Sequence, residues 1–217
     1  MKRLLILILA ILAGCGQTEQ EKQKQIKLET QKRVEVETLK RIKKQLKSSG
    51  TFTDEDAEYL SQRYSKELYH ISDLTSITNS QAEILSKVES IRLDGLTSLT
   101  DEQAESLSNV SGLYLNGLTS INDEQAKSFS KVEILVLSGL PTITDKQVKI
   151  LSKVKTLNLS GLTSLTDEQA EDLSKVLWLE LRGVEEITEP QAESLSKVKY
   201  LYIPMSCLEL IDQYKTP

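Results

Sequence analysis

The fold is decided by the 22-residue stretch Leu157-Asn-Leu-Ser-Gly-Leu-Thr-Ser-Leu-Thr-Asp-Glu-Gln-Ala-Glu-Asp-Leu-Ser-Lys-Val-Leu-Trp178, whose pattern recurs without insertion along most of the chain. Residues 69–200 divide into six such units, which open at Tyr69, Ile91, Leu113, Leu135, Leu157 and Leu179. A fixed period of this size is the signature of a solenoid, in which each unit buries its apolar face only against its neighbours.

Each unit begins with a short strand. Leu157 and Leu159 alternate with polar residues, which is the pattern of a strand with one buried face. A glycine follows the strand in five units, at Gly95, Gly117, Gly139, Gly161 and Gly183. Either a left-handed or a crowded backbone would require glycine there. Asp73 stands at this position in the first unit, so we expect a different turn in that unit.

A short helix completes the unit. Thr100 and Gln103 fit a capping box, in which the threonine caps the helix and the glutamine reaches back to it. Ala104, Leu107 and Val110 then form the apolar stripe of a two-turn helix. A helix this short is marginal alone and forms because stacking buries the stripe. The same cap position is filled in all six units, by Thr78, Thr100, Asn122, Thr144, Thr166 and Thr188.

These units resemble leucine-rich repeats of the strand-then-helix kind. The resemblance covers residues 69–200 and implies an α/β solenoid with a parallel sheet on its concave side and helices on its convex side. Both ends of such a stack need caps. We expect the N-terminal cap within residues 51–68, as a helix-only unit, and the last strand and C-terminal cap within residues 201–217. Cys207, beside two leucines, is expected to be a buried apolar residue.

The N-terminus has the pattern of a targeting signal. A basic start is followed by the apolar run Leu4–Leu12, which is too short to span a membrane and fits a secretory signal. Leu12-Ala-Gly-Cys15 then resembles the bacterial lipobox. That resemblance implies that residues 1–14 are a lipoprotein signal peptide and that Cys15 is lipidated, which anchors the protein in the bacterial cell envelope. Gly16 replaces the aspartate of the inner-membrane retention signal, so the outer membrane is favoured.

A charged stem, residues 15–50, joins the lipidated cysteine to the repeats. Residues 17–49 hold ten Lys/Arg and five Asp/Glu, and Val36, Leu39, Ile42 and Leu46 predict a helix with a narrow apolar stripe. Three interpretations remain open: a solvated spacer, a short coiled coil, or a stem that lies on anionic lipid.

The charge of the body excludes some functions. Beyond residue 49 there are 15 basic and 27 acidic residues, so nucleic acid is not expected as a partner. No phosphate-binding loop, metal-ligand spacing or nucleophile elbow is present, so we predict no catalytic residues and no cofactor. His70, the only histidine, is expected at the surface. The acidic residues at the helix starts suit either the helix dipole or Ca²⁺, and the dipole is the simpler explanation.

The residues most suited to bind a partner are the strand residues that point away from the core. They differ from repeat to repeat, whereas the core and turn residues recur. We expect them to form a partner-binding concave face that comprises Arg92, Asp94, Tyr114, Asn116, Ile134, Val136, Asn158, Trp178, Glu180, Arg182, Tyr200 and Tyr202. Arg and aromatic residues are typical anchors of protein interfaces. Alternatively, Ile134, Trp178 and Tyr200 merely cover strand ends or pack on one another.

The function expected from these features is a membrane-anchored, non-catalytic module that binds another protein through this concave face. Two alternatives belong to other classes. The chain could be a structural envelope lipoprotein whose stem spaces or oligomerises it. It could also bind a glycan at the cell surface, with aromatic rings as stacking platforms.

Overall fold

The computed structural model describes residues 18–64 and 68–215, so the signal segment and Cys15 lie outside the described residues. The chain separates into two compact units, Met1–Gln45 and Leu46–Pro217. Helix α2 (Glu19–Ser49) makes up the described part of the first unit, and its last four residues belong to the second; it covers the stretch where the spacing of apolar residues predicts a helix. Among the described residues, no helix is long and apolar enough to cross a membrane.

The second unit is an α/β leucine-rich-repeat solenoid, as the repeat pattern predicts. Its helices are α3 (Asp54–Arg63), α4 (Asn79–Leu85), α5 (Asp101–Leu107), α6 (Asp123–Phe129), α7 (Asp145–Leu151), α8 (Asp167–Leu173), α9 (Glu189–Leu195) and α10 (Met205–Asp212). Its strands are β1 (Leu68–His70), β2 (Ser90–Arg92), β3 (Gly112–Tyr114), β4 (Ile134–Val136), β5 (Thr156–Asn158), β6 (Trp178–Glu180) and β7 (Tyr200–Tyr202).

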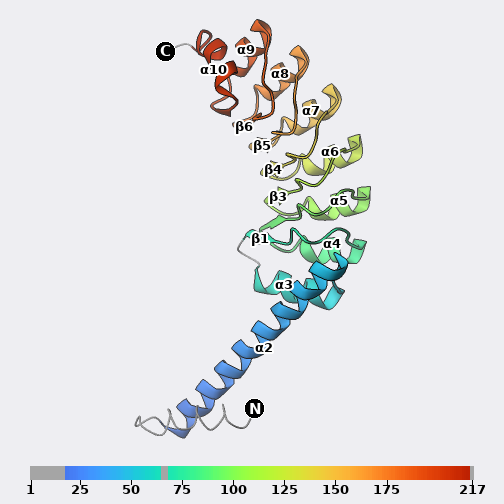
Figure 1. Ribbon diagram of the computed structural model, residues 1–217, viewed down its shortest axis with the longest axis vertical. Coiled ribbons are helices and arrows are strands. Elements are labelled where there is room, and N and C mark those ends of the chain that lie inside the picture. The colour runs from blue at the N-terminus through green and yellow to red at the C-terminus, as the bar shows by residue number, and fades with distance from the viewer. Residues whose placement is uncertain (1–17, 65–67, 216–217) are drawn as a thin grey trace. The chain divides into compact units, whose positions relative to one another are not determined.

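The strands described here form one seven-stranded parallel sheet in chain order. Equivalent residues of successive repeats pair, as Ile91 does with Leu113 and Leu113 with Leu135, so the register of the sheet equals the sequence period. Figure 1 shows the strands along the inner side of the curved stack and helices α4 to α9 along its outer side. The predicted concave sheet and convex helices are therefore confirmed.

The strands begin and end one residue earlier than the Leu-x-Leu pattern predicts. Leu157 and Leu159 predict a strand over residues 157–159, and the fifth strand lies at Thr156–Asn158; the last strand, predicted within residues 201–217, begins at Tyr200. The cause is a turn: the Leu159 carbonyl accepts a bond from the Leu162 amide at 3.0 Å. Leu159 therefore points into the core from the turn and not from the strand.

The core is built from the apolar positions of the repeat. In the third repeat Leu113, Leu115 and Leu118 are buried, as are Ala126 and Phe129 of the following helix. The flanking strand residues are only half-buried in strands β2, β4, β5 and β6. This alternation confirms that neighbouring strand residues face opposite sides of the sheet.

Crowding, and not a left-handed backbone, explains the recurrent glycines. Among the described residues, Gly50 is the one with positive φ. A Cβ added at Gly139 would lie 2.1 Å from the carbonyl oxygen of Asn116 and 2.6 Å from that of Leu118, both in the preceding repeat. Asp73 is tolerated in the first unit because no complete repeat precedes it.

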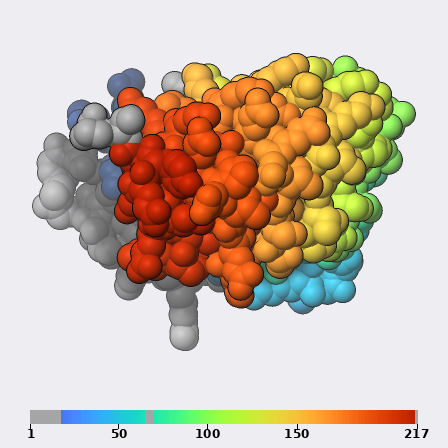
Figure 2. Space-filling model, turned by 90° about the horizontal axis from the view of Figure 1, so that it is seen from above, coloured from blue at the N-terminus to red at the C-terminus, as the bar shows by residue number. Residues whose placement is uncertain are grey.

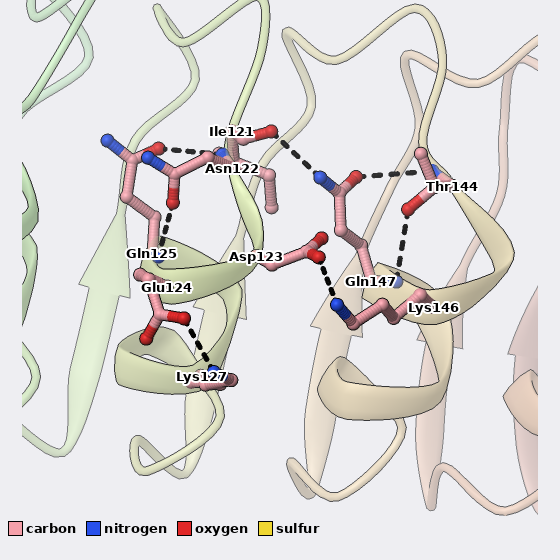
Figure 3. A network of polar contacts seen from close by, with 9 residues as sticks. All are labelled: Ile121, Asn122, Asp123, Glu124, Gln125, Lys127, Thr144, Lys146 and Gln147. Carbon is pink, nitrogen blue, oxygen red and sulfur yellow. Dashed lines mark hydrogen bonds and ion pairs between the residues drawn. The ribbon is translucent and has the colours of Figure 1, made fainter.

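A buried glutamine in each repeat joins neighbouring units. In Figure 3 the Gln147 backbone amide donates to the Thr144 hydroxyl at 3.2 Å, and the Gln147 Oε1 accepts from the Thr144 amide at 3.1 Å. The predicted capping box is thus confirmed, and it recurs in α4 to α9. The Gln147 Nε2 also donates to the carbonyl of Ile121, one repeat back, at 2.9 Å. The same side chain therefore caps its own helix and links two repeats.

We expect the Gln147→Leu variant to be less stable by about 2 kcal/mol. The change removes one cap bond and leaves the half-buried Ile121 carbonyl without its donor. Urea unfolding followed by circular dichroism measures the loss, with the exposed Lys149→Leu, on the same helix, as control. Equal midpoints for the two variants would contradict the linking role.

The aspartates that begin helices α6, α7 and α8 contact the next repeat. Figure 3 shows the Asp123 carboxylate paired with Lys146, and this contact lowers the pKa of Asp123 and raises that of Lys146. Asp145 and Asp167 accept bonds from the hydroxyls of the next N-cap threonine at 3.0 and 3.2 Å. Within the described residues no group of three or more His, Cys, Asp or Glu side chains could hold a metal ion. These three aspartates are thus linked to the next repeat, whereas Glu124 pairs with Lys127 of its own helix.

The N-terminal end of the solenoid has its own cap. Helix α3 begins with a capping box formed by Thr53 and Asp56. The Phe52 carbonyl accepts from Gln81 Nε2 at 2.8 Å, as the corresponding carbonyl does in the first five repeats, so α3 occupies the place of a helix-only unit. Gly50 ends α2 in the left-handed conformation, and its carbonyl accepts from the Thr75 amide at 2.8 Å.

Helix α10 closes the other end of the solenoid. Cys207 and Ile211 are buried, and the Cys207 thiol donates to the Val184 carbonyl at 3.4 Å. Burial raises the pKa of this thiol, which agrees with the prediction of a buried apolar residue. Figure 2 looks onto this end, where the residues drawn in red lie over the orange residues of the preceding repeats.

Candidate functional site: the concave face

The concave face consists of three rows of side chains that run across the strands. The first row comes from the first strand position and includes Ile134, Thr156, Trp178 and Tyr200. The second row comes from the third position and includes Arg92, Tyr114, Val136, Asn158, Glu180 and Tyr202. The third row follows two residues later and includes Asp94, Asn116, Ser138, Ser160 and Arg182. Cross-strand pairing places the members of a row side by side, at about 4.8 Å per strand.

A chain of hydrogen bonds connects the polar members of the second and third rows. Asn116 Nδ2 donates to Asp94 at 2.8 Å, and its Oδ1 accepts from the Ser138 amide at 3.2 Å. The Ser138 hydroxyl donates to Asn158 Oδ1 at 2.9 Å. Asn158 Nδ2 then donates to Glu180 at 2.9 Å. These contacts link strands along most of the sheet, which the repeat pattern did not reveal.

An arginine pairs with the carboxylate at each end of this series of hydrogen bonds. Arg92 Nη1 lies 3.6 Å from Asp94 Oδ2, and Arg182 Nε donates to Glu180 at 3.1 Å. The carboxylates of Asp94 and Glu180 are therefore neutralised within the protein. These polar side chains already bond to one another. To bond to a partner instead, they would have to give up those internal hydrogen bonds. Asp94, Asn116, Asn158 and Glu180 are thus held in place on the sheet surface by bonds to one another and to the two arginines.

Aromatic rings gather at the C-terminal end of the concave face. The Trp178 ring lies 5.1 Å from that of Tyr200 and 5.3 Å from that of Tyr202, the second pair nearly stacked at 22°. These rings do pack on one another, which was one of the two interpretations of their sequence positions. Packing does not bury them: Tyr200 and Tyr202 remain 44% and 41% exposed.

Cations lie over the tyrosines of this face. The Arg182 guanidinium lies 5.4 Å from the centre of the Tyr202 ring, and the Lys199 ammonium lies 5.4 Å from that of Tyr200. At the other end, the Arg92 guanidinium lies 4.7 Å from the Tyr114 ring. Contacts of this geometry hold a cation over the ring face with about 0.5–1 kcal/mol at exposed sites. They hold the arginine and tyrosine side chains in fixed positions on this face.

Between these two ends the surface is apolar. Ile134 and Val136 of β4 are half-buried, with Thr156 of β5 beside Ile134. The structure thus places all twelve residues predicted for the face on one side of the sheet or at its immediate end. These twelve residues fall into three groups: polar side chains that are hydrogen-bonded to one another, apolar side chains in the middle of the face, and aromatic side chains at its C-terminal end.

Sequence reasoning missed three exposed residues beside the aromatic end: Leu177, Lys199 and Met205. Leu177 is 47% exposed and Met205 is 74% exposed. A signal for Leu177 was present, because this position is polar in the other repeats, as in Glu133 and Lys155. The position of Met205 was not predictable, since it depends on where α10 begins after Pro204.

Comparison with known proteins gives likenesses of fold. No family model matches this chain. No curated protein matches it. A chain in the structure of the Toll–Spatzle complex of Drosophila aligns with a TM-score of 0.47 at 17% identity, covering 68% of this chain and 22% of that one. An internalin, InlF, of Listeria monocytogenes aligns with a TM-score of 0.46 at 18% identity, covering 74% of this chain and 47% of that one.

The functional domain of InlJ from the same bacterium aligns with a TM-score of 0.44 at 15% identity, covering 66% of this chain and 30% of that one. The chain therefore spans less than half of the length of each of these three proteins.

Proposed function

We propose that this protein is a membrane-anchored, non-catalytic interaction module that binds a partner protein through the concave face of its solenoid. The observation that carries the proposal is the exposed aromatic end, where Trp178, Tyr200 and Tyr202 lie together with Arg182. Trp, Tyr and Arg are the residues that dominate the energetics of protein interfaces. The neighbouring polar groups are bonded to each other, so a partner can cover them at small cost.

A photo-crosslinking residue in living cells tests the proposal. We expect a residue placed at Tyr202 or Tyr114 to give a discrete heavier band, because both lie on the concave face. The matched control is Glu171, which is exposed on α8 on the convex side. Bands of equal strength from both sides, or none from the concave sites, would contradict binding through this face. Mass spectrometry of the adduct identifies the partner.

A glycan is the second candidate ligand, because exposed tyrosine rings also stack on sugars. One feature disfavours it: Trp178 and Tyr202 stack on each other, which occupies ring faces that a sugar would need. Trp178 is the only tryptophan of the chain, so its fluorescence reports on this end alone. Saturable quenching by cell-surface oligosaccharides, without a protein adduct, would favour the glycan.

Anchoring is the other part of the proposal, and it rests on the lipobox that ends at Cys15. We expect the Cys15→Ala variant to move from the membrane fraction to the soluble fraction, because each lipid methylene contributes about 0.8 kcal/mol to membrane binding and the variant carries no lipid. Fractionation with and without high salt is the measurement, and Gly16→Ala is the control. A variant that still sediments with membranes would contradict the lipid anchor. Outer-membrane location is proposed from Gly16 and is checked by separating the two membranes.

A further inference from the structure

Exposed large apolar side chains of the solenoid gather toward its C-terminal end. Among the side chains described in residues 46–64 and 70–215, the large apolar ones that are exposed are Leu177, Tyr200, Tyr202 and Met205. Leu177 and Tyr200 belong to the last two repeats, Tyr202 ends β7, and Met205 begins α10. The rings of Tyr200 and Tyr202 both contact Trp178 and so form one apolar patch, and an exposed apolar patch marks a contact site.

A basic hollow lies at the same end, on the edge where the helices finish. It has a volume of about 750 Å³ and is lined by Glu193, Ser196, Lys197, Val198, Lys199, Tyr214 and Lys215. Three lysines face one glutamate, although the body beyond residue 49 carries 12 more acidic than basic residues. Two other hollows are acidic in character: one of about 470 Å³ contains Glu185 and Glu186, and one of about 310 Å³ has four carboxylates against two lysines.

Two of the lysines in this hollow have no anionic partner. Lys215 pairs with Asp212 at 3.0 Å, but neither Lys197 nor Lys199 forms an ion pair with a described carboxylate. In the same repeat position two units earlier, Lys155 is paired with Glu133 at 3.0 Å. The position of Lys199 is therefore unpaired at this end and paired two units earlier, whereas the position of Lys197 is also without an ion pair to a described residue two units earlier, at Lys153.

Lys199 joins the hollow to the aromatic patch. Its side chain lines the hollow, and its ammonium group lies 5.4 Å from the centre of the Tyr200 ring. The ring of Tyr200 in turn contacts Trp178. Apolar rings and unpaired ammonium groups thus form one continuous surface that crosses from the sheet to the basic edge.

We infer that this composite surface binds an extended acidic segment of the partner protein that also carries an aromatic or aliphatic residue. The inference rests on the proposed function and specifies which part of a partner the solenoid recognises. The carboxylates enter the lysine hollow, and the apolar side chain packs on Trp178, Tyr200 and Tyr202. Lysine suits this role because its ammonium groups are point charges on flexible stems that can follow carboxylates at variable positions.

The test uses the full chain in a mild non-ionic detergent, with the peptide acetyl-Asp-Glu-Asp-Phe-Leu-amide as probe and Trp178 fluorescence as readout. We expect saturable binding that weakens with salt, because charges more than about 8 Å apart are screened at physiological ionic strength. The peptide acetyl-Asn-Gln-Asn-Phe-Leu-amide, which lacks the charges, should bind at least about tenfold more weakly.

The double variant Lys197→Glu/Lys199→Glu should lose at least about tenfold in affinity for the acidic peptide. The control Lys153→Glu/Lys155→Glu changes the same charges at the same repeat positions, exactly two units earlier in the sequence period, and should bind within about twofold of the parent. Circular dichroism verifies that both variants are folded.

Equal binding of both peptides, equal losses in both double variants, or no binding would overturn the inference. A fluorescence shift with phosphatidylglycerol vesicles but not with peptide would overturn it as well, since the surface would then contact lipid. None of these results depends on crosslinking at Tyr114 and Tyr202. If those crosslinks form while the acidic peptide fails, the proposed function stands and this description of the partner is wrong.

Discussion

Replacing Leu159 with aspartate is expected to unfold the central repeats at room temperature. Leu159 is fully buried beneath the turn that follows β5, between the core leucines of neighbouring repeats. The variant loses the apolar burial of a leucine and places a carboxylate without partners in the core. Together these effects cost at least about 4 kcal/mol, a large part of the 5–15 kcal/mol by which a typical domain is stable.

The loss should spread beyond one repeat, because each unit is stable only against its neighbours. Urea unfolding followed by far-ultraviolet circular dichroism measures it. Thr163→Asp is the matched control, since it adds the same charge at an exposed position of the same repeat and should stay within about 0.5 kcal/mol of the parent. A Leu159→Asp variant with an unchanged midpoint would refute the register of the repeats.

Adding one methyl group at Gly139 is expected to destabilise the solenoid by about 3 kcal/mol. The new Cβ of Gly139→Ala would lie 2.1 Å from the Asn116 carbonyl oxygen and 2.6 Å from the Leu118 carbonyl oxygen. Both are backbone atoms of the preceding repeat, so neither can rotate away and the two repeats must separate. The same urea experiment measures the effect.

The first repeat supplies the control for this prediction. Asp73 stands where the other repeats have glycine and is exposed, because no complete repeat lies beneath it. Asp73→Ala should therefore change stability by no more than about 0.5 kcal/mol. If Asp73→Ala and Gly139→Ala lose the same stability, the requirement for glycine is not one of crowding between repeats.

Much of the fold is determined by the repeat itself. A 22-residue period with Leu-x-Leu and a capped apolar stripe admits one arrangement, because strands and helices of equal length can bury their apolar faces only by stacking in register. Even the capping boxes are local, since Thr144 and Gln147 are three residues apart. For these features the sequence was sufficient.

Other features depend on contacts between repeats that no single unit specifies. The second bond of Gln147, to the carbonyl of Ile121, joins residues 26 apart and exists because stacking brings them together. The reason for the recurrent glycines also depends on a neighbouring repeat. Its carbonyl oxygens leave no room for a Cβ, whereas the backbone of these glycines is not left-handed.

The candidate site shows the same division. The sequence alone identified the residues that point away from the core, because side chains alternate along a strand. It did not show that Asp94, Asn116, Asn158 and Glu180 are bonded to one another, since they come from different strands. The tertiary structure decided which side chains remain exposed. Stacking of the strands brings the polar side chains within hydrogen-bond distance of one another. The rings of Tyr200 and Tyr202, on the last strand, stay exposed, and the unpaired Lys199 lies over that of Tyr200.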